Sequence, residues 1–186
     1  MSTCSYQAYL LVDGYNIIGH WPRLKTLRQQ QGLEAAREEL IEILINFSAN
    51  KDYQTEIVFD AQYRNSPCSK ERFTSSLSVC YTAFLQTADT YIERICADYS
   101  RNQGEVLSRL IVATSDQAEK LTILGYGAEW LSAQRLGSEV DSAINNINKR
   151  KRPKKKNQGR FLASSLDAKV QQKLSQLRLG MIPPDA

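Results

Sequence analysis

The stretch Tyr9-Leu-Leu-Val-Asp-Gly-Tyr-Asn-Ile-Ile18 decides the fold class of this 186-residue chain. Residues 10–12 form a short apolar run of the kind that a parallel sheet buries on both faces. Asp13 follows where this strand should end, and Gly14 lets the chain turn sharply. Ligands of open α/β sheets bind beyond the carboxyl ends of the strands. A carboxylate at this position is therefore better placed for chemistry than for packing.

The same arrangement recurs twice, because Ile57-Val-Phe-Asp60 and Leu110-Ile-Val-Ala-Thr-Ser-Asp116 also join an apolar run to an aspartate. Residues 20–24 and 65–67 are predicted to lie in loops. Patterns with helical periodicity alternate with the strands. The pattern predicts strands over 9–13, 56–60, 78–82, 107–114 and 128–131, and helices over 33–50, 87–102, 117–124 and 133–148. This alternation predicts an α/β fold, a three-layer α/β/α sandwich around a central, mainly parallel sheet.

The charge is unevenly distributed along the chain. The net charge is +4, but residues 149–160 contain eight basic residues and no acidic one, which leaves a net charge of −4 on the rest. We predict one domain over 1–148, a basic linker over 149–160, and an amphipathic helix with a tail over 161–186. Such a block either contacts nucleic acid or is only a solvated tail. The residues of the block expected to contact RNA are Lys149, Arg150, Lys151, Arg152, Lys154, Lys155 and Lys156.

Several classes of protein are excluded by what the sequence lacks. No apolar run approaches the roughly 18 residues of a membrane span, and the first residues do not resemble a signal peptide, so we expect a cytoplasmic protein without a membrane partner. The only histidine is His20 and no C-x-x-C occurs, which argues against a zinc site. Neither a G-x-S-x-G sequence nor a nucleotide-binding glycine motif is present. The sequence does not indicate an oligomeric state.

The acidic residues predict a metal site. Asp89 and Glu93 lie four residues apart in Thr87-Ala-Asp-Thr-Tyr-Ile-Glu93 and share one face of the predicted helix. If this helix starts near the strand ends, Asp89 faces Asp13 and Asp116. Clustered carboxylates repel one another unless a cation neutralises them. Without histidine or cysteine ligands, the fitting cation is Mg²⁺ or Mn²⁺, which activates water for attack on a phosphodiester.

Each of these side chains also has a structural interpretation. Asp116 begins Asp-Gln-Ala-Glu119, which resembles a capping box. Asp60 is compatible with a simple turn, and Asp89 with an acid that complements the helix dipole. Asn16 either donates a hydrogen bond to a phosphate or satisfies the turn after Gly14. Arg64, in the polar loop after Asp60, either meets RNA or packs on the surface.

Four segments together resemble the motifs of YacP-like NYN-domain proteins, within the PIN-like nuclease superfamily. They are, in chain order, Leu11-Val-Asp-Gly-Tyr-Asn-Ile-Ile18, Val58-Phe-Asp-Ala61, Thr87-Ala-Asp-Thr-Tyr-Ile-Glu93 and Ala113-Thr-Ser-Asp-Gln117. The resemblance covers roughly residues 7–148, so the basic block and the terminal helix look like an addition to the family domain. It implies a PIN-like fold and a metal-dependent endoribonuclease; a bacterial relative associates with the ribosome and cuts messenger RNA during translation.

The resemblance also implies roles for individual residues. Asp13 and Asp89 become the leading metal ligands, and Asp116 joins them. Asp60 and Glu93 become supporting acids. Asp60 also counts among the catalytic acids, together with the three metal ligands. Asn16 orients Asp13 or the substrate. We therefore expect cleavage of single-stranded RNA by metal-activated water; the alternative is a non-catalytic RNA- or ribosome-binding protein with a degenerate acidic pocket.

Overall fold

The computed structural model describes residues 6–60, 68–101 and 109–151, with side chains as far as residue 146. The chain divides into two units, Met1–Asn146 and Ile147–Ala186, and the fold described here is that of the first. Three predictions lie outside the described residues: the loop at 65–67 with Arg64, the side-chain contacts of the basic block, and the amphipathic helix with its tail over 161–186.

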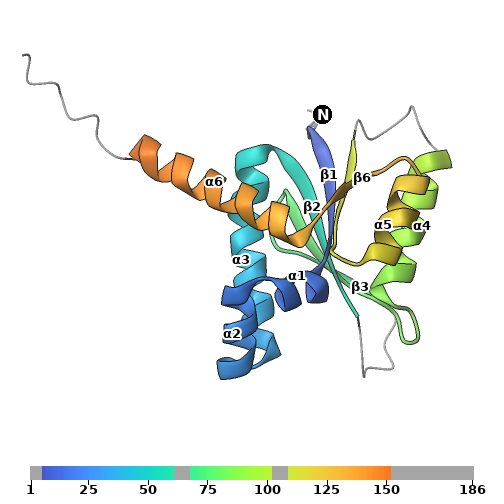
Figure 1. Ribbon diagram of the computed structural model, residues 1–186, viewed down its shortest axis with the longest axis horizontal. Helices are drawn as coiled ribbons and strands as arrows, with labels where there is room; N and C mark the ends of the chain where they lie inside the picture. Colours follow the sequence, from blue (N-terminus) through green and yellow to red (C-terminus); the bar gives the residue numbers. More distant parts are fainter. Residues whose placement is uncertain (1–5, 61–67, 102–108, 152–186) are drawn as a thin grey trace, which may run out of the picture. The chain divides into compact units, whose positions relative to one another are not determined.

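The first unit is built on one six-stranded sheet (Figure 1). Its strands are β1 (Ala8–Asp13), β2 (Tyr53–Phe59), β3 (Ser69–Arg72), β4 (Leu77–Tyr81), β5 (Leu110–Ala113) and β6 (Glu129–Leu131). They lie in the order β3-β4-β2-β1-β5-β6, and every neighbouring pair is parallel except β3 and β4. The prediction of a mainly parallel sheet is therefore confirmed.

Helices cover both faces of this sheet. They are α1 (Gly14–His20), α2 (Pro22–Gln31), α3 (Leu33–Lys51), α4 (Ala88–Arg101), α5 (Gln117–Gly125) and α6 (Ala133–Lys151). Figure 1 shows α4 and α5 on one face, and α1, α3 and α6 on the other. Strand β1 supplies both cores, since Leu10 and Val12 pack with α1, α2, α3 and α6 whereas Leu11 packs with α4 and α5. This is the predicted α/β/α sandwich.

Two local predictions are wrong. Residues 20–24 do not form a loop: α1 ends at His20 and α2 starts at Pro22, because a proline suits the first position of a helix. Trp21 separates the two helices, and its indole Nε1 donates to the carbonyl oxygen of Ala133 over 2.7 Å. Strand β3 was not predicted, because its four residues are all exposed and carry no apolar pattern.

Gly14 does not make the sharp turn that the sequence suggested. It is the first residue of α1 and has no positive φ. Its side of the helix instead lies directly against Phe59, the last residue of β2. A Cβ at this position would overlap the phenyl ring, with even the Cζ atom only 2.8 Å away. Glycine is required here because the backbone of α1 approaches an aromatic ring in the core.

We therefore expect Gly14→Ala to lower the free energy of unfolding by about 1–3 kcal/mol, the usual cost of overpacking a core. Gly19→Ala is the matched control in the same helix, because a Cβ there meets nothing within 4 Å. That control should raise the free energy of unfolding by about 0.5–1 kcal/mol, since alanine favours the helix. Urea denaturation measures both values. Equal unfolding midpoints for the two variants would contradict the close approach to Phe59.

Candidate metal centre

The central strands of the sheet deliver aspartates to one edge. Asp13 is the last residue of β1, Asp60 follows β2, and Asp116 lies just beyond β5. Strand β1 pairs in parallel with both β2 and β5, so the three carboxyl ends lie side by side. Asp89 comes to the same edge in the first turn of α4. The predicted convergence of these aspartates on one edge of the sheet is therefore present.

Three carboxylates come closest together. One oxygen each from Asp13, Asp89 and Glu119 lie within 4.8 Å of one another. Asp13 and Glu119 are buried, and Asp89 is exposed. Two of these residues are predicted metal ligands, and the third was missed. The signal for Glu119 was present in Asp-Gln-Ala-Glu119, but it was interpreted only as part of a capping box.

Burial and mutual repulsion both shift the titration of these groups. Burial, followed by the charges of Asp89 and Asp60, raises the pKa of Asp13 to about 6, although the backbone N–H of Asn16 opposes the rise. Burial raises the pKa of Glu119 to about 7, and the charges of Asp13, Asp89 and Asp116 add to the rise. The pKa of Asp89 is raised by burial and by the charges of Asp60 and Asp116. Without a bound cation, the fully ionised form of this cluster is therefore energetically unfavourable.

Asp116 and Asp60 both cap helices beside the cluster. The Asp116 Oδ1 accepts from the backbone N–H groups of Ala118 at 2.7 Å and Glu119 at 3.2 Å. The structural role that the capping box suggested is thus present. The Asp60 Oδ1 accepts from the backbone N–H of Ala88, which fixes the start of α4. These caps orient the first turns that carry Glu119 and Asp89, and a role of Asp116 in metal binding stays a prediction.

Asn16 joins two strand ends. Its backbone N–H donates to the Asp13 Oδ1 over 3.1 Å. Its side-chain carbonyl oxygen accepts from the backbone N–H of Ser115, beyond the end of β5, over 2.8 Å. The two roles considered for the Asn16 side chain stay predictions, and its link to Ser115 was not foreseen. Asn16 thereby keeps the loop that leads to Asp116 next to Asp13.

Glu93 lies outside the group of three. Its side chain is exposed on α4, one turn beyond Asp89, and its Oε1 accepts from the Tyr126 hydroxyl at the long distance of 3.5 Å. A supporting role for Glu93 remains a prediction.

The donor set fits a hard divalent cation. Both carboxylate oxygens of Glu119 are buried and have no hydrogen-bond partner among the described residues. An unpaired buried carboxylate is costly, and a cation held jointly with Asp13 and Asp89 would remove that cost. Three carboxylates without histidine or cysteine suit Mg²⁺ or Mn²⁺ better than zinc.

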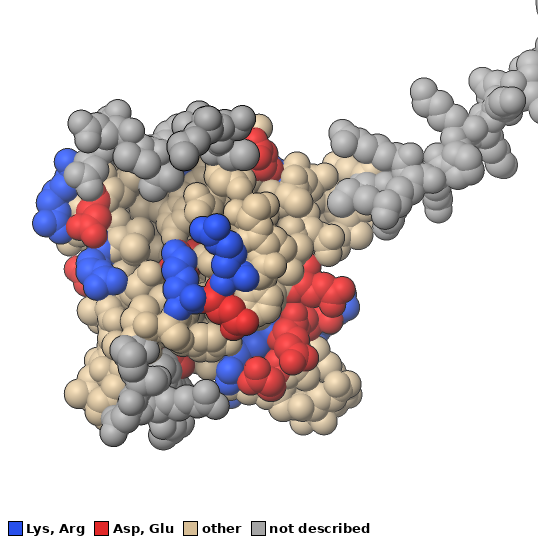
Figure 2. All heavy atoms as spheres, turned by 180° about the vertical axis from the view of Figure 1, so that it is seen from behind, with Lys and Arg blue, Asp and Glu red and all other residues tan. Residues whose placement is uncertain are grey.

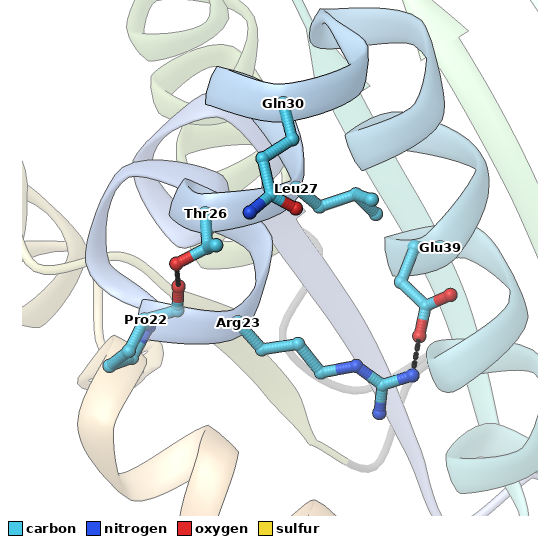
Figure 3. Close-up of a pocket in the computed structure, with 6 residues that line it drawn as sticks. All are labelled: Pro22, Arg23, Thr26, Leu27, Gln30 and Glu39. Atoms are coloured by element: carbon cyan, nitrogen blue, oxygen red, sulfur yellow. Dashed lines mark hydrogen bonds and ion pairs between the residues drawn. The ribbon is translucent and has the colours of Figure 1, made fainter.

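A hollow of about 480 Å³ on the surface lies elsewhere, between α2 and α3 (Figure 3). Its wall includes the ion pair between Arg23 and Glu39. None of the acids of the cluster lines it. The arrangement of charged groups, rather than the depth of this hollow, therefore identifies the candidate site.

Comparison with known families fits this geometry. The family model for the YacP-like NYN domain matches residues 10–179. This chain belongs to the YacP-like NYN-domain family. It is 34% identical over 143 residues to the uncharacterized protein YacP of Bacillus subtilis strain 168, a match that covers 77% of this chain and 81% of that protein.

Solved structures of the family share the fold. The crystal structure of Rae1 (YacP) from Bacillus subtilis matches 96% of this chain and 98% of its own, with 31% identity and a TM-score of 0.63. A mutant of the same protein matches 91% of this chain and 99% of its own, with 28% identity and a TM-score of 0.63.

The family assignment places the domain among PIN-like nucleases and corrects one expectation. The family match runs through the basic block to residue 179. The block and the segment after it are therefore not an addition to the family domain. Within the described part of the chain, no helix is both long enough and apolar enough to cross a membrane.

Stability of the metal-free protein should depend on pH through Glu119 and Asp13. Their raised pKa values mean that the folded state binds protons more tightly than the unfolded state. This contribution is complete below about pH 4 and is lost as the pH rises through 6 to 7. The free energy of unfolding of the wild-type protein should fall between about pH 5 and pH 8. In Glu119→Gln this fall should be smaller by about 1–2 kcal/mol.

Urea denaturation in EDTA at both pH values measures this effect, with Glu93→Gln as the control from the exposed face of α4. Millimolar Mg²⁺ should stabilise the wild-type protein at the higher pH and have little effect on Glu119→Gln, because the variant lacks one ligand. Identical pH profiles for the wild type and Glu119→Gln would contradict the coupling of Glu119 to the cluster.

Proposed function

We propose that this chain is a cytoplasmic, metal-dependent endoribonuclease that cleaves single-stranded RNA. The observation that carries the proposal is the group of three carboxylates within 4.8 Å, Asp13, Asp89 and Glu119, at the carboxyl edge of the sheet. Glu119 contributes two buried oxygens without hydrogen-bond partners among the described residues. Membership in a PIN-like nuclease family supports RNA as the substrate and hydrolysis as the reaction.

In this mechanism Asp13, Asp89 and Glu119 hold the cation. The chemistry that Mg²⁺ or Mn²⁺ would supply there is Lewis-acid activation of a water and of the scissile phosphate. Asp60 and Asp116 hold the first turns of α4 and α5, which carry Asp89 and Glu119. Asn16 keeps the chain beyond β5 against Asp13.

The products follow from the chemistry of the attacking group. The chain contains one histidine, so it lacks the histidine pair that would promote attack by the 2′-hydroxyl of the RNA. Attack by water instead leaves 5′-phosphate and 3′-hydroxyl ends. The resemblance to the family favours messenger RNA, cut at the ribosome, as the substrate.

Replacement of Asp13 tests the reaction. Asp13→Asn should lower the rate of Mn²⁺-dependent cleavage of a labelled single-stranded RNA by about 100-fold or more, because the most buried of the strand-end carboxylates is lost. The protein should remain folded, as circular dichroism and the melting temperature would show. Asp98→Asn is the matched control, since Asp98 lies exposed on α4 and pairs with Arg101.

Full activity of Asp13→Asn, or cleavage that persists in EDTA, would contradict the proposed chemistry. RNA binding by the wild-type protein without any metal-dependent cutting would favour the non-catalytic alternative.

The basic block should supply phosphate contacts. Replacement of Lys154, Lys155 and Lys156 by glutamine should weaken RNA binding and lower the slope of log Kd against log salt concentration by about 2, at about 0.7 for each lost contact with single-stranded RNA. Fluorescence anisotropy at several salt concentrations measures the slope. An unchanged affinity and slope would mean that the block serves only as a solvated tail.

A further inference from the structure

Two side chains in the described part of the chain have buried polar atoms without a hydrogen-bond partner. One is Glu119, in the acidic cluster, and the other is Arg37, through its Nε atom. Arg37 lies on α3, which is not one of the elements that carry the cluster. A buried N–H without a partner costs free energy comparable to a lost hydrogen bond. Among the described residues, nothing accepts from this N–H of Arg37.

The surroundings of Arg37 lie at the carboxyl end of β2 and the start of α1. Its Cζ atom lies 5.9 Å from the ring centroids of both Tyr15 and Phe59. These two rings are in contact, with centroids 5.0 Å apart. Phe59 directly precedes Asp60, and Tyr15 follows Asp13 by two residues. The guanidinium group is thus held on aromatic rings that adjoin the carboxyl edge of the sheet.

The one ion pair that Arg37 makes in this part of the chain uses only one nitrogen of its guanidinium group. Its Nη1 atom lies 3.0 Å from the Oε2 of Glu34, whose side chain is 70% exposed, whereas that of Arg37 is 21% exposed. An ion pair with an exposed partner contributes about 0–1 kcal/mol. A guanidinium group has five N–H donors in a fork that matches the oxygens of a phosphate. A phosphate can therefore engage Arg37 at little cost from Glu34.

We propose that Arg37, held by Tyr15 and Phe59, binds a backbone phosphate of the RNA next to the acidic cluster and positions the strand for cleavage. The inference rests on the proposed function and adds a residue to it. Acidic residues gather on the corner of the molecule where α2 and α3 lie (Figure 2). The exposed acids of α3 are Glu34, Glu38 and Glu42. Because α3 presents these acids, Arg37 is not part of a general basic surface, and its charge acts at one place.

Replacement of Arg37 tests the contact without requiring catalysis. Anisotropy of a fluorescent single-stranded RNA is measured in EDTA on the full chain carrying Asp13→Asn. Adding Arg37→Met should weaken binding about 5- to 20-fold and lower the salt slope by about 0.7, as expected for one lost contact to single-stranded RNA. Arg37→Lys should keep most of the slope but not the affinity, because lysine lacks the fork.

Arg23→Met is the matched control, since this arginine is 73% exposed and pairs with Glu39 (Figure 3). This variant should change the affinity for RNA less than about twofold, because an exposed ion pair contributes little free energy. If Arg37→Met lowers only the melting temperature and leaves the salt slope unchanged, Arg37 acts in packing alone and the proposal is overturned.

A second pair of variants has the opposite expected sign. Glu34→Gln removes the ion pair of Arg37 and should tighten RNA binding about twofold, whereas Glu38→Gln removes an equal charge from the same helix and should have a smaller effect. Equal effects would assign the change to overall charge and overturn the specific contact. If the protein cleaves RNA in a reaction that needs Asp13, but Arg37→Met changes neither the affinity nor the salt slope, only the inference about Arg37 is refuted. If Arg37→Met lowers the affinity and the salt slope of a protein that never cuts RNA, only the nuclease proposal is refuted.

Discussion

Repulsion among carboxylates is the interaction on which the rest of this structure depends. Asp13, Asp89 and Glu119 approach within 4.8 Å at the edge of the sheet, and Asp60 and Asp116 add further negative charge. Two of the three are buried, where water screens their charges least. A fold that keeps such a group must hold it by other contacts, and those contacts come from both the strands and the helices around the site.

The contacts that hold the acids are mainly to the backbone and the core. The three residues before Asp13 in β1, Leu10, Leu11 and Val12, are fully buried and pack into both cores, so Asp13 cannot withdraw to solvent. Caps by Asp60 and Asp116 fix the helices that carry the other two acids. The close approach of Gly14 to Phe59 holds α1 against the end of β2. Stability and function are thus linked, because the elements that pack the sheet also set the spacing of its charges.

The same repulsion bears on the substrate. RNA is a polyanion, and an acidic pocket does not attract it without a cation. In the proposed function, a divalent ion neutralises the pocket, and basic side chains draw in the strand from outside it. The basic block and Arg37 then have different roles, since the block provides affinity along the RNA backbone and Arg37 holds one phosphate near the reacting position.

The sequence by itself determined the sandwich, because the alternation of buried strands and amphipathic helices is a local pattern that allows few topologies. It also determined that Asp13, Asp60 and Asp116 reach one edge, since carboxyl ends of adjacent parallel strands coincide. Tertiary structure alone decided which carboxylates meet. Glu119 joins Asp13 and Asp89 because of how the first turn of α5 faces the sheet, and spacing along the chain does not encode that direction. The place of Arg37 likewise depends on partners distant in sequence, for which a single chain carries no local signal. Strand β3 pairs with the neighbouring β4, but its four exposed residues carry no apolar pattern that would predict a strand.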